Sequence, residues 1–432
     1  MRGNVLFQYV APCVCLMVWM NVVISGLLMM QQPEQVHLSA TGNVTEITVT
    51  WSTVNDTQSL VQYGMMTPDL QATGCSSKFV DGGLFRRAQF IHRVKLSGLK
   101  PGAKYVYRCG SNAGWSPLFF FKALQDGSDW SPRLALYGDM GSVNAQSLGR
   151  LQVAAQGGEF DAIIHIGDFA YDLNSDEGRV GDDFMRQIES VAAYVPYMTT
   201  VGNHEVAYNF SHYKNRFTMP SYTDNQNLWY SWNIGPVHFV VFSTEVYFYT
   251  QYSKETKHNQ LMWLLKDLKE ANEPKKRAKH PWIITLGHRP MYCSNSDFND
   301  CTKEGSLVRA ALEDLFYKYG VDMEIWAHEH NYERLWPVYR EKVYNGTKDA
   351  PYTNPKAPVH IITGSAGCKE RHSPFFLPKP WDAFRSSDYG FTVMHVINQT
   401  HLTWQQISDD QKGKVIDKVM LIKDKHGPEA WL

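Results

Sequence analysis

The most constraining feature of the sequence is an apolar run that ends in side chains able to bind metal ions. Ile163–Ile166 is rich in β-branched residues, and Gly167, Asp168 and Tyr171 follow it. Such a run is typical of a buried strand, and sites in open α/β sheets lie at the carboxyl ends of strands. A carboxylate can bridge two cations, and a phenol ionises readily only beside a strongly acidic metal such as Fe(III). The motif therefore suggests a two-metal centre, although a single copy is more often a strand followed by a core tyrosine.

The same pattern recurs along the chain, which makes a chance arrangement improbable. The further apolar runs lead into Gly138-Asp139, Gly202-Asn203-His204-Glu205, Gly287-His288 and Ala327-His328-Glu329-His330. Metal centres draw nitrogen and oxygen ligands from segments that are distant in sequence. Together the runs predict a metal site at one edge of an α/β sheet.

These blocks resemble the signature motifs of the purple acid phosphatases, within the calcineurin-like metallophosphoesterases. They are present as Gly138-Asp139-Met140-Gly141, Gly167-Asp168-Phe169-Ala170-Tyr171, Gly202-Asn203-His204-Glu205, Leu286-Gly287-His288 and Ala327-His328-Glu329-His330. The last block departs from the family's usual Gly-His-x-His, because alanine occupies position 327. An alanine is tolerated there if the backbone needs no positive φ.

The resemblance implies a binuclear centre with two ligand sets. An Fe(III) site would use Asp139, Asp168, Tyr171 and His330. A divalent site would use Asp168, Asn203, His288 and His328, so that Asp168 bridges the two ions. Zn(II) or Fe(II) is expected in the second site, with Mn(II) as another candidate. The histidines at 328 and 330 would point the same way in an extended strand, so spacing alone does not decide how the two ions share them.

The activity implied by the resemblance is that of an acid phosphatase, which hydrolyses phosphate monoesters with metal-activated hydroxide as the nucleophile. His204 is the expected phosphate contact and proton donor, and the simpler alternative is a turn histidine satisfied by hydrogen bonds. Glu205 is expected to orient its loop. The expected substrate is a small phosphate monoester or a phosphoprotein.

Two other functions stay open at this point. One is a neutral metallophosphodiesterase of the same superfamily, and Tyr171 argues against it because diesterase relatives usually lack that phenol. The other is a secreted glycoprotein that binds partners through its β-sandwich without catalysis. The complete ligand set argues against a purely structural role, because a structural site requires no open coordination position.

The segment Cys293–Cys301 departs from the family pattern. Many long members carry two histidines about ten residues after the ligand that corresponds to His288, and this segment has none. His372 could substitute, or it could be a surface histidine. Cys293 and Cys301 are the expected disulfide pair, because the short loop between them could close; free buried thiols are the alternative. His165 and His238, inside strand-like runs, are expected to be structural.

Patterning along the chain predicts two domains of different class. Residues 31–125 contain short alternating runs typical of an all-β sandwich, and Leu99–Tyr105 resembles the loop before a fibronectin type III tyrosine corner. Residues 130–335 alternate strands with helix-like segments, as an α/β metallophosphoesterase domain requires, with a β-sheet sandwich flanked by helices. Residues 356–425 resemble the family's C-terminal segment, which completes the catalytic domain.

The N-terminus and the glycosylation motifs indicate secretion. Residues 1–30 hold a long apolar run after Arg2, which predicts a signal peptide, with an uncleaved anchor as the alternative. After cleavage, no segment would span a bilayer. A secreted or lysosomal glycoprotein is consistent with the sequons at Asn43, Asn55, Asn209, Asn345 and Asn398. The formal net charge of −1 does not predict binding to nucleic acid. The sequence does not indicate the oligomeric state.

Overall fold

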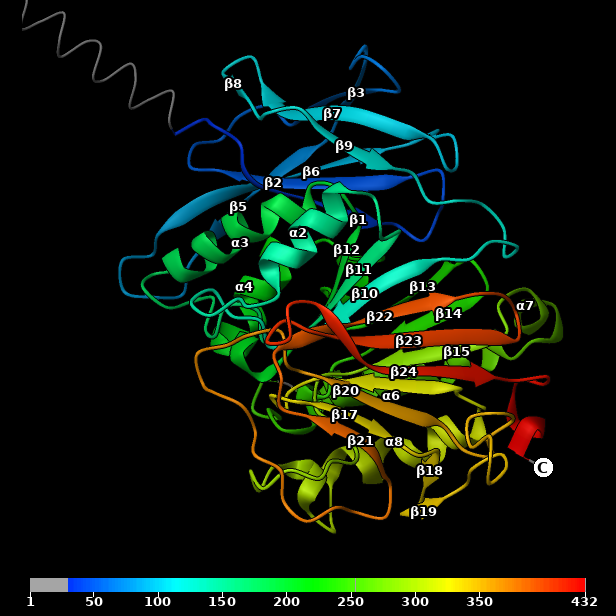
Figure 1. Cartoon of the computed structure of the whole chain (residues 1–432). Helices are drawn as coiled ribbons and strands as arrows, with labels where there is room; N and C mark the ends of the chain where they lie inside the picture. Colours follow the sequence, from blue (N-terminus) through cyan, green and yellow to red (C-terminus); the bar gives the residue numbers. More distant parts are fainter. Residues whose placement is uncertain (1–29, 253, 432) are drawn as a thin grey trace, which may run out of the picture.

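The computed structural model describes residues 30–252 and 254–431, which form an N-terminal β-domain and a larger α/β domain (Figure 1). Residues 1–29 of the predicted signal peptide lie outside the described part of the chain. No helix among the described residues is long and apolar enough to cross a membrane.

The N-terminal domain is a sandwich of two antiparallel sheets. The first sheet has the order β1 (Glu34–Ala40), β2 (Ile47–Thr53), β6 (Ala88–Leu96) and β5 (Cys75–Val80). The second has the order β4 (Leu70–Thr73), β3 (Leu60–Gly64), β7 (Lys104–Ser111) and β8 (Gly114–Trp115), with β9 (Phe119–Lys122) paired to β7. The sequence did not predict β4, β5 and β8, because their residues are largely exposed or too few to show apolar alternation.

Two details confirm the predicted fibronectin-like sandwich. Trp51 on β2 is buried and stacks on His92, with ring centroids 4.9 Å apart. The backbone N–H of Lys100 donates a 2.9 Å hydrogen bond to the hydroxyl of Tyr105, which is the arrangement of a tyrosine corner.

The second domain contains two mixed sheets. One has the order β12 (Tyr197–Thr200), β11 (Ala162–Ile166), β10 (Arg133–Tyr137), β22 (Gly390–Val396), β23 (His401–Ser408) and β24 (Lys414–Ile422). The other has the order β13 (Tyr230–Ile234), β14 (Val237–Val241), β15 (Trp282–Leu286), β16 (Met323–Trp326), β20 (Val359–Thr363), β17 (Tyr332–Leu335) and β21 (Asp382–Ser386). A small hairpin joins β18 (Val338–Tyr339) and β19 (Lys342–Val343).

The strands at the centre of both sheets have continuous apolar sequences because they are buried on both faces. Every residue of β11 and of β15 is buried, and β10 to β12 run parallel, as do β14, β15, β16 and β20. Their carboxyl ends therefore gather at common edges. The C-terminal residues supply β20 and β21 to one sheet and β22 to β24 to the other, so they are part of both.

Helices cover the sheets, as the predicted α/β class requires. They are α2 (Leu148–Gln156), α3 (Arg179–Ala192), α4 (Ala207–Arg216), α5 (Tyr222–Asn225), α6 (Lys254–Ala271), α7 (Pro274–Lys279) and α8 (Leu307–Lys318). Short 3-10 turns are η1 (Asn203–Glu205), η2 (Glu245–Tyr247), η3 (Asp300–Thr302) and η4 (Pro428–Trp431). In Figure 1, α3 lies beside the N-terminal domain, where it contacts β1, and β1 also contacts β12.

Candidate metal centre

The predicted ligands lie on the loops that follow five of the parallel strands. Asp139 follows β10, the segment Asp168–Tyr171 follows β11, and Asn203 follows β12 in the first sheet. His288 follows β15, and the segment His328–His330 follows β16 in the second sheet. The site is therefore assembled where the carboxyl ends of the two sheets meet.

The backbone at several ligands adopts the left-handed region that non-glycine residues rarely occupy. The φ angles are 58° at Asp139, 52° at Asp168, 56° at Tyr171 and 69° at His328. Such conformations cost free energy and cluster at functional sites, where the surrounding structure holds them. The turn at His328 also separates it from His330, so the two imidazoles reach different ligand groups.

Glycines next to the ligands leave room for close backbone packing. A Cβ at Gly202 would lie 2.3 Å from Oδ1 of Asp168, and one at Gly138 would lie 2.4 Å from Cβ of Ala327. Ala327 itself is not among the residues with positive φ. The alanine that departs from the family motif is accordingly accommodated by the glycine opposite it.

The residues of the predicted Fe(III) site lie together. The Tyr171 hydroxyl is 2.8 Å from Nε2 of His330 and 3.4 Å from Oδ1 of Asp139. Nδ1 of His330 donates to the carbonyl oxygen of Arg371 at 2.8 Å. A backbone acceptor on one ring nitrogen leaves the other free to bind a metal, which is the usual arrangement of a ligand histidine.

The residues of the predicted divalent site form a second group around Asp168. Nε2 of His288 lies 3.1 Å from Oδ2 of Asp168 and 3.2 Å from Oδ1 of Asn203, while its Nδ1 donates to the carbonyl of Ile166 at 2.9 Å. The ligand atoms of Asp168, His288 and His328 all lie within 4.8 Å of one another. Carboxylate, amide and imidazole donors at this spacing suit a divalent ion such as zinc or iron.

Buried carboxylates dominate the electrostatics of both groups. Burial lowers the pKa of His288, but the charge of Asp168 outweighs it and raises this pKa to about 10. Burial also lowers the pKa of His330, whereas the hydrogen bond to Asp139 contributes most to raising it to about 12. The site thus favours added positive charge, and two metal ions would provide it. Donor types, spacing and charge all fit a binuclear centre.

Ionisation of Tyr171 requires such a metal. Burial raises the pKa of its phenol well above the usual range, and the charges of Asp139 and Asp168 raise it further. Only a strongly acidic cation beside the oxygen would make the phenolate the favoured form.

His204 lies beside the ligands without joining either group. Its backbone N–H donates to Oδ1 of Asp168 at 2.9 Å, and its Nδ1 is 2.9 Å from Oδ1 of Asp172. Burial lowers the pKa of His204, but Asp172 and Asp168 raise it to about 9. Its Nε2 lies 3.7 Å from Oε1 of Glu370. The imidazolium can therefore donate a proton or bind an anion near the centre.

Glu205 holds the loops rather than facing the cavity. Its carboxylate accepts hydrogen bonds of 2.9 to 3.0 Å from the backbone N–H groups of Asp168, Phe169 and Gly202. Burial and the nearby charge of Asp168 raise its pKa to about 8. This arrangement fits the expectation that Glu205 orients its loop.

A cavity of about 380 Å3 opens above the ligands. It is lined by Asp168, Asn203, His204, Asp297, Asn299, His328, His330, Glu370, Arg371, His372 and Ser373. His372 thus does reach the site. His165, which bonds Tyr197, and His238, which bonds Asn233 and Asp267, have structural partners instead.

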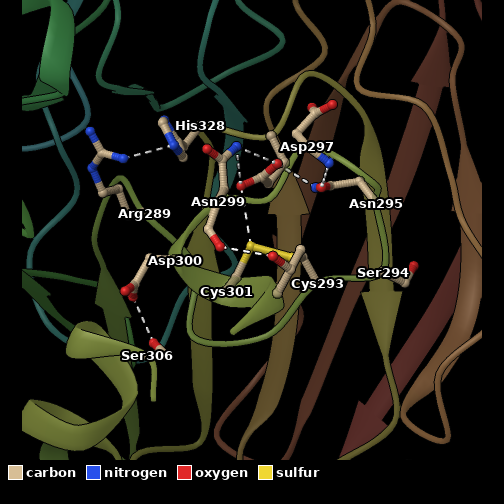
Figure 2. Close-up of a disulfide and its surroundings, with 12 residues drawn as sticks. Arg289, Cys293, Ser294, Asn295, Asp297, Asn299, Asp300, Cys301, Ser306 and His328 are labelled. Atoms are coloured by element: carbon tan, nitrogen blue, oxygen red, sulfur yellow. Dashed lines mark hydrogen bonds between the residues drawn. A yellow bond between two sulfur atoms is a disulfide. The ribbon is translucent and has the colours of Figure 1, made fainter. Parts of the chain in front are cut away.

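The loop between β15 and α8 supports the ligands of the second sheet (Figure 2). Cys293 and Cys301 form a disulfide whose Cα atoms are 5.5 Å apart. Within this loop, Asn295 and Asn299 donate side-chain hydrogen bonds to the carboxylate of Glu329, at 3.1 Å from Asn299. Glu329 lies between the two ligand histidines in sequence. The loop therefore fastens the segment that carries them.

For several residues near the predicted metal centre, no sequence motif was strong enough to predict that they belong to the site. Arg289 places Nη1 2.9 Å from Nε2 of His328, and Glu245 from η2 binds its guanidinium at 3.0 Å. Arg289 directly follows a ligand and could have been noticed on that ground. Glu245 and the asparagine pair become neighbours of the site only through folding.

Family comparisons match the chain in three parts. The models are Purple acid Phosphatase, N-terminal domain at residues 33–123, Calcineurin-like phosphoesterase at residues 132–332, and Iron/zinc purple acid phosphatase-like protein C at residues 357–418. Acid phosphatase type 7 of Danio rerio is 58% identical over 416 residues, which cover 93% of each chain. The chain belongs to the purple acid phosphatase family. Acid phosphatase type 7 of Homo sapiens is 53% identical and covers 97% of this chain and 98% of its own.

A solved structure agrees with this membership. Purple acid phosphatase PPD1 from yellow lupin (Lupinus luteus) superimposes with a TM-score of 0.78 at 26% identity, over 91% of this chain and 75% of that chain. The family, the fold class and the enzyme class predicted from the sequence are thus confirmed. The chain is an acid phosphatase with a metallophosphoesterase fold, and its family implies a binuclear metal centre.

Proposed function

We propose that this purple acid phosphatase hydrolyses phosphate monoesters at a centre of Fe(III) and a divalent ion, with zinc expected and Fe(II) or Mn(II) as alternatives. Asp139, Asp168, Tyr171 and His330 would hold Fe(III); Asp168, Asn203, His288 and His328 would hold the divalent ion. The observation that carries the proposal is the Tyr171 hydroxyl 2.8 Å from His330 Nε2, beside Asp139. When bound, the metal pair supplies Lewis acidity toward phosphate and water.

The residues of the chain supply orientation and a proton. Asp172 accepts from Nδ1 of His204, so the Nε2–H of this imidazolium is available to the cavity. There it can bind a phosphoryl oxygen and protonate the departing alkoxide. Glu205 holds the backbone of Asp168 in place, and Arg289 holds His328.

We also propose that the protein enters the secretory pathway and carries N-linked glycans. The sequon residues Asn43, Asn209, Asn345 and Asn398 are exposed, and Asn55 is partly buried. A disulfide is typical of proteins that fold in an oxidising compartment. Secretion is the expected outcome, with the lysosome as the alternative destination and small monoesters or phosphoproteins as substrates.

The test compares hydrolysis of a chromogenic monoester and a chromogenic diester from roughly pH 4 to 8. Wild-type protein is expected to turn over the monoester in acid, and Asp168→Asn to lose at least about 100-fold, because the bridging carboxylate is removed. Metal content of both proteins, measured by elemental analysis, shows whether the loss follows loss of metal. A preference for the diester near neutral pH would contradict the proposal and support a phosphodiesterase.

A further inference from the structure

The lining of the cavity combines acidic groups with a single arginine. Besides metal ligands, its described lining includes the carboxylates of Asp297 and Glu370 and one guanidinium, that of Arg371. Arginine is always protonated at physiological pH, whereas the other basic lining groups are histidines. Arg371 is therefore the one side chain of this lining with a permanent positive charge.

The segment Cys293–Cys301 contributes no cation. Asn295 and Asn299 direct their side-chain N–H groups to Glu329, and Asp297 adds a negative charge at the cavity (Figure 2). The asparagines of this segment, which has no histidine, thus hold the segment His328–His330 in place. Within the described lining, the permanent attraction for an anion therefore comes from Arg371.

The histidines of that lining already have partners. His204 bonds Asp172, and His330 bonds the carbonyl of Arg371. The ring of His372 packs on Tyr389, with centroids 4.0 Å apart, and its Nδ1 lies 3.4 Å from the carbonyl oxygen of His330. The Nε2–H of His204 is assigned to the phosphoryl group, so Arg371 is the remaining basic group of the lining that is free to bind another part of the ligand.

Arg371 combines a fixed backbone with a free guanidinium. Its carbonyl accepts the 2.8 Å hydrogen bond from His330, and its φ of 76° lies in the left-handed region. Within residues 30–252 and 254–431, no hydrogen bond or ion pair holds its guanidinium, and the residue is exposed. A strained backbone tied to a metal ligand, with an unpaired cation at the rim, is typical of a binding role.

We propose that Arg371 is a specificity-determining residue that binds a second anionic group, such as a carboxylate, on the leaving part of the phosphate monoester. The inference rests on the proposed function. The buried Asp168 and the half-buried His328 and His330 line the inner part of the cavity, where the phosphoryl group would bind. Arg371 lines the cavity and is exposed, so its guanidinium can reach a portion of the substrate that projects outward.

The experiment uses two esters that differ in one group. 3-Phosphoglycerate carries a carboxylate where glycerol 1-phosphate carries a hydroxymethyl group, and both release a primary alkoxide. With the metal-loaded enzyme at pH ~6, where the carboxylate is ionised, Arg371→Gln is expected to lose about tenfold in kcat/KM for 3-phosphoglycerate. The same variant should stay within about twofold of wild type for glycerol 1-phosphate, and Arg371→Lys should recover part of the loss.

Lys369→Gln is the matched control, because Lys369 is an exposed cation of the same loop that does not line the cavity. Equal losses for both esters would show contact with the phosphoryl group or a damaged fold, and would overturn the assignment. So would no loss for either ester, or an equal effect of Lys369→Gln.

Failure of the proposed function is distinguishable from failure of this inference. If the wild-type enzyme turns over neither ester, the proposed function is wrong, and calorimetric titration of the metal-loaded protein with the same two compounds tests Arg371 alone. Weaker binding of 3-phosphoglycerate only, in Arg371→Gln, supports the carboxylate contact. Unchanged binding overturns it.

Discussion

At the scale of single residues, carboxylates raise the pKa of the histidine that would donate the proton. His204 is largely buried, which disfavours its charged form, yet Asp172 and Asp168 raise its pKa to about 9. In turn, the hydrogen bond from His204 lowers the pKa of Asp172. The pair therefore keeps a proton on His204 throughout the acid range in which a proton donor is needed.

Replacing Asp172 with asparagine should move the alkaline limb of the pH profile to lower pH. His204 donates in its protonated form, which exists below its pKa, and removal of the Asp172 charge lowers that pKa. The expected shift is roughly one unit in the pH dependence of kcat.

Glu370→Gln is the control for this variant, because Glu370 lies farther away, at 3.7 Å from Nε2, and should shift the profile less. An unchanged alkaline limb in Asp172→Asn would show that His204 is not the proton donor.

At the scale of elements, the loop between β15 and α8 connects a disulfide to the predicted metal ligands His328 and His330. The sulfur of Cys301 lies 3.2 Å from Oε1 of Glu329, and Asn299 donates to both oxygens of the same carboxylate. The backbone of Ser296 also donates to the carbonyl of Pro374, next to the Ser373 that receives the N–H of His330 on its hydroxyl. Two loops that are hydrogen-bonded to each other therefore both hold the segment His328–His330.

Removal of the disulfide should lower the stability of the fold and speed the release of metal. The double variant Cys293→Ser with Cys301→Ser is expected to lose about 2 kcal/mol in free energy of unfolding. It should also release metal to a chelator several times faster, since Asn295 and Asn299 no longer hold Glu329 firmly. Stopped-flow chelation and thermal denaturation measure the two effects.

Cys75→Ser, at an exposed free cysteine of the N-terminal sandwich, is the matched control and should change neither quantity. Lower stability with unaltered release of metal would mean that the loop supports the fold alone.

At the scale of the whole molecule, a buried ionic cluster joins the two domains. Arg216 at the end of α4 bonds Asp182 of α3 at 2.8 Å and Oε1 of Gln35 on β1 at 3.3 Å, and Arg87 from the N-terminal domain also pairs with Asp182. Burial raises the pKa of Asp182, but Arg216 and Arg87 outweigh it, and the pKa is lowered. The resulting stabilisation is complete above the unfolded pKa of ~3.9 and is lost as pH falls through the lower folded value.

The cluster should therefore stabilise the molecule throughout the mildly acid range. Arg216→Met is expected to lower the free energy of unfolding by ~3 kcal/mol at neutral pH, because Asp182 loses a buried partner. The difference from wild type should shrink as pH falls below about 4, because Asp182 is protonated first in the unfolded chain and then, at its lower folded pKa, in the native protein. Denaturant titration at several pH values measures both effects.

Arg186→Met is the comparison, since Arg186 joins the same two domains through Glu34 but has 47% of its side chain exposed. A loss below about 1 kcal/mol is expected there. Similar losses in the two variants would contradict a special contribution from burial.

Much of this organisation was predictable because it depends on local patterns. Continuous apolar runs such as Ile163–Ile166 become fully buried strands, and each ends at a polar residue type that belongs to a metal site. The loop before Tyr105 forms the predicted tyrosine corner. The strands β4 and β5 were missed, since an exposed edge requires no apolar alternation and leaves no periodic signal.

The sequence by itself determined the order of the domains, the strands that end in metal-binding residues and the types of those ligands, because strand burial and ligand chemistry are properties of short segments. Tertiary structure alone decided that a left-handed turn at His328 directs the side chains of His328 and His330 to different groups of residues. It also decided that Asn299 binds Glu329 and that the guanidinium of Arg371 remains unpaired among the described residues. These outcomes depend on contacts between residues far apart in the chain, and no spacing within one segment encodes them.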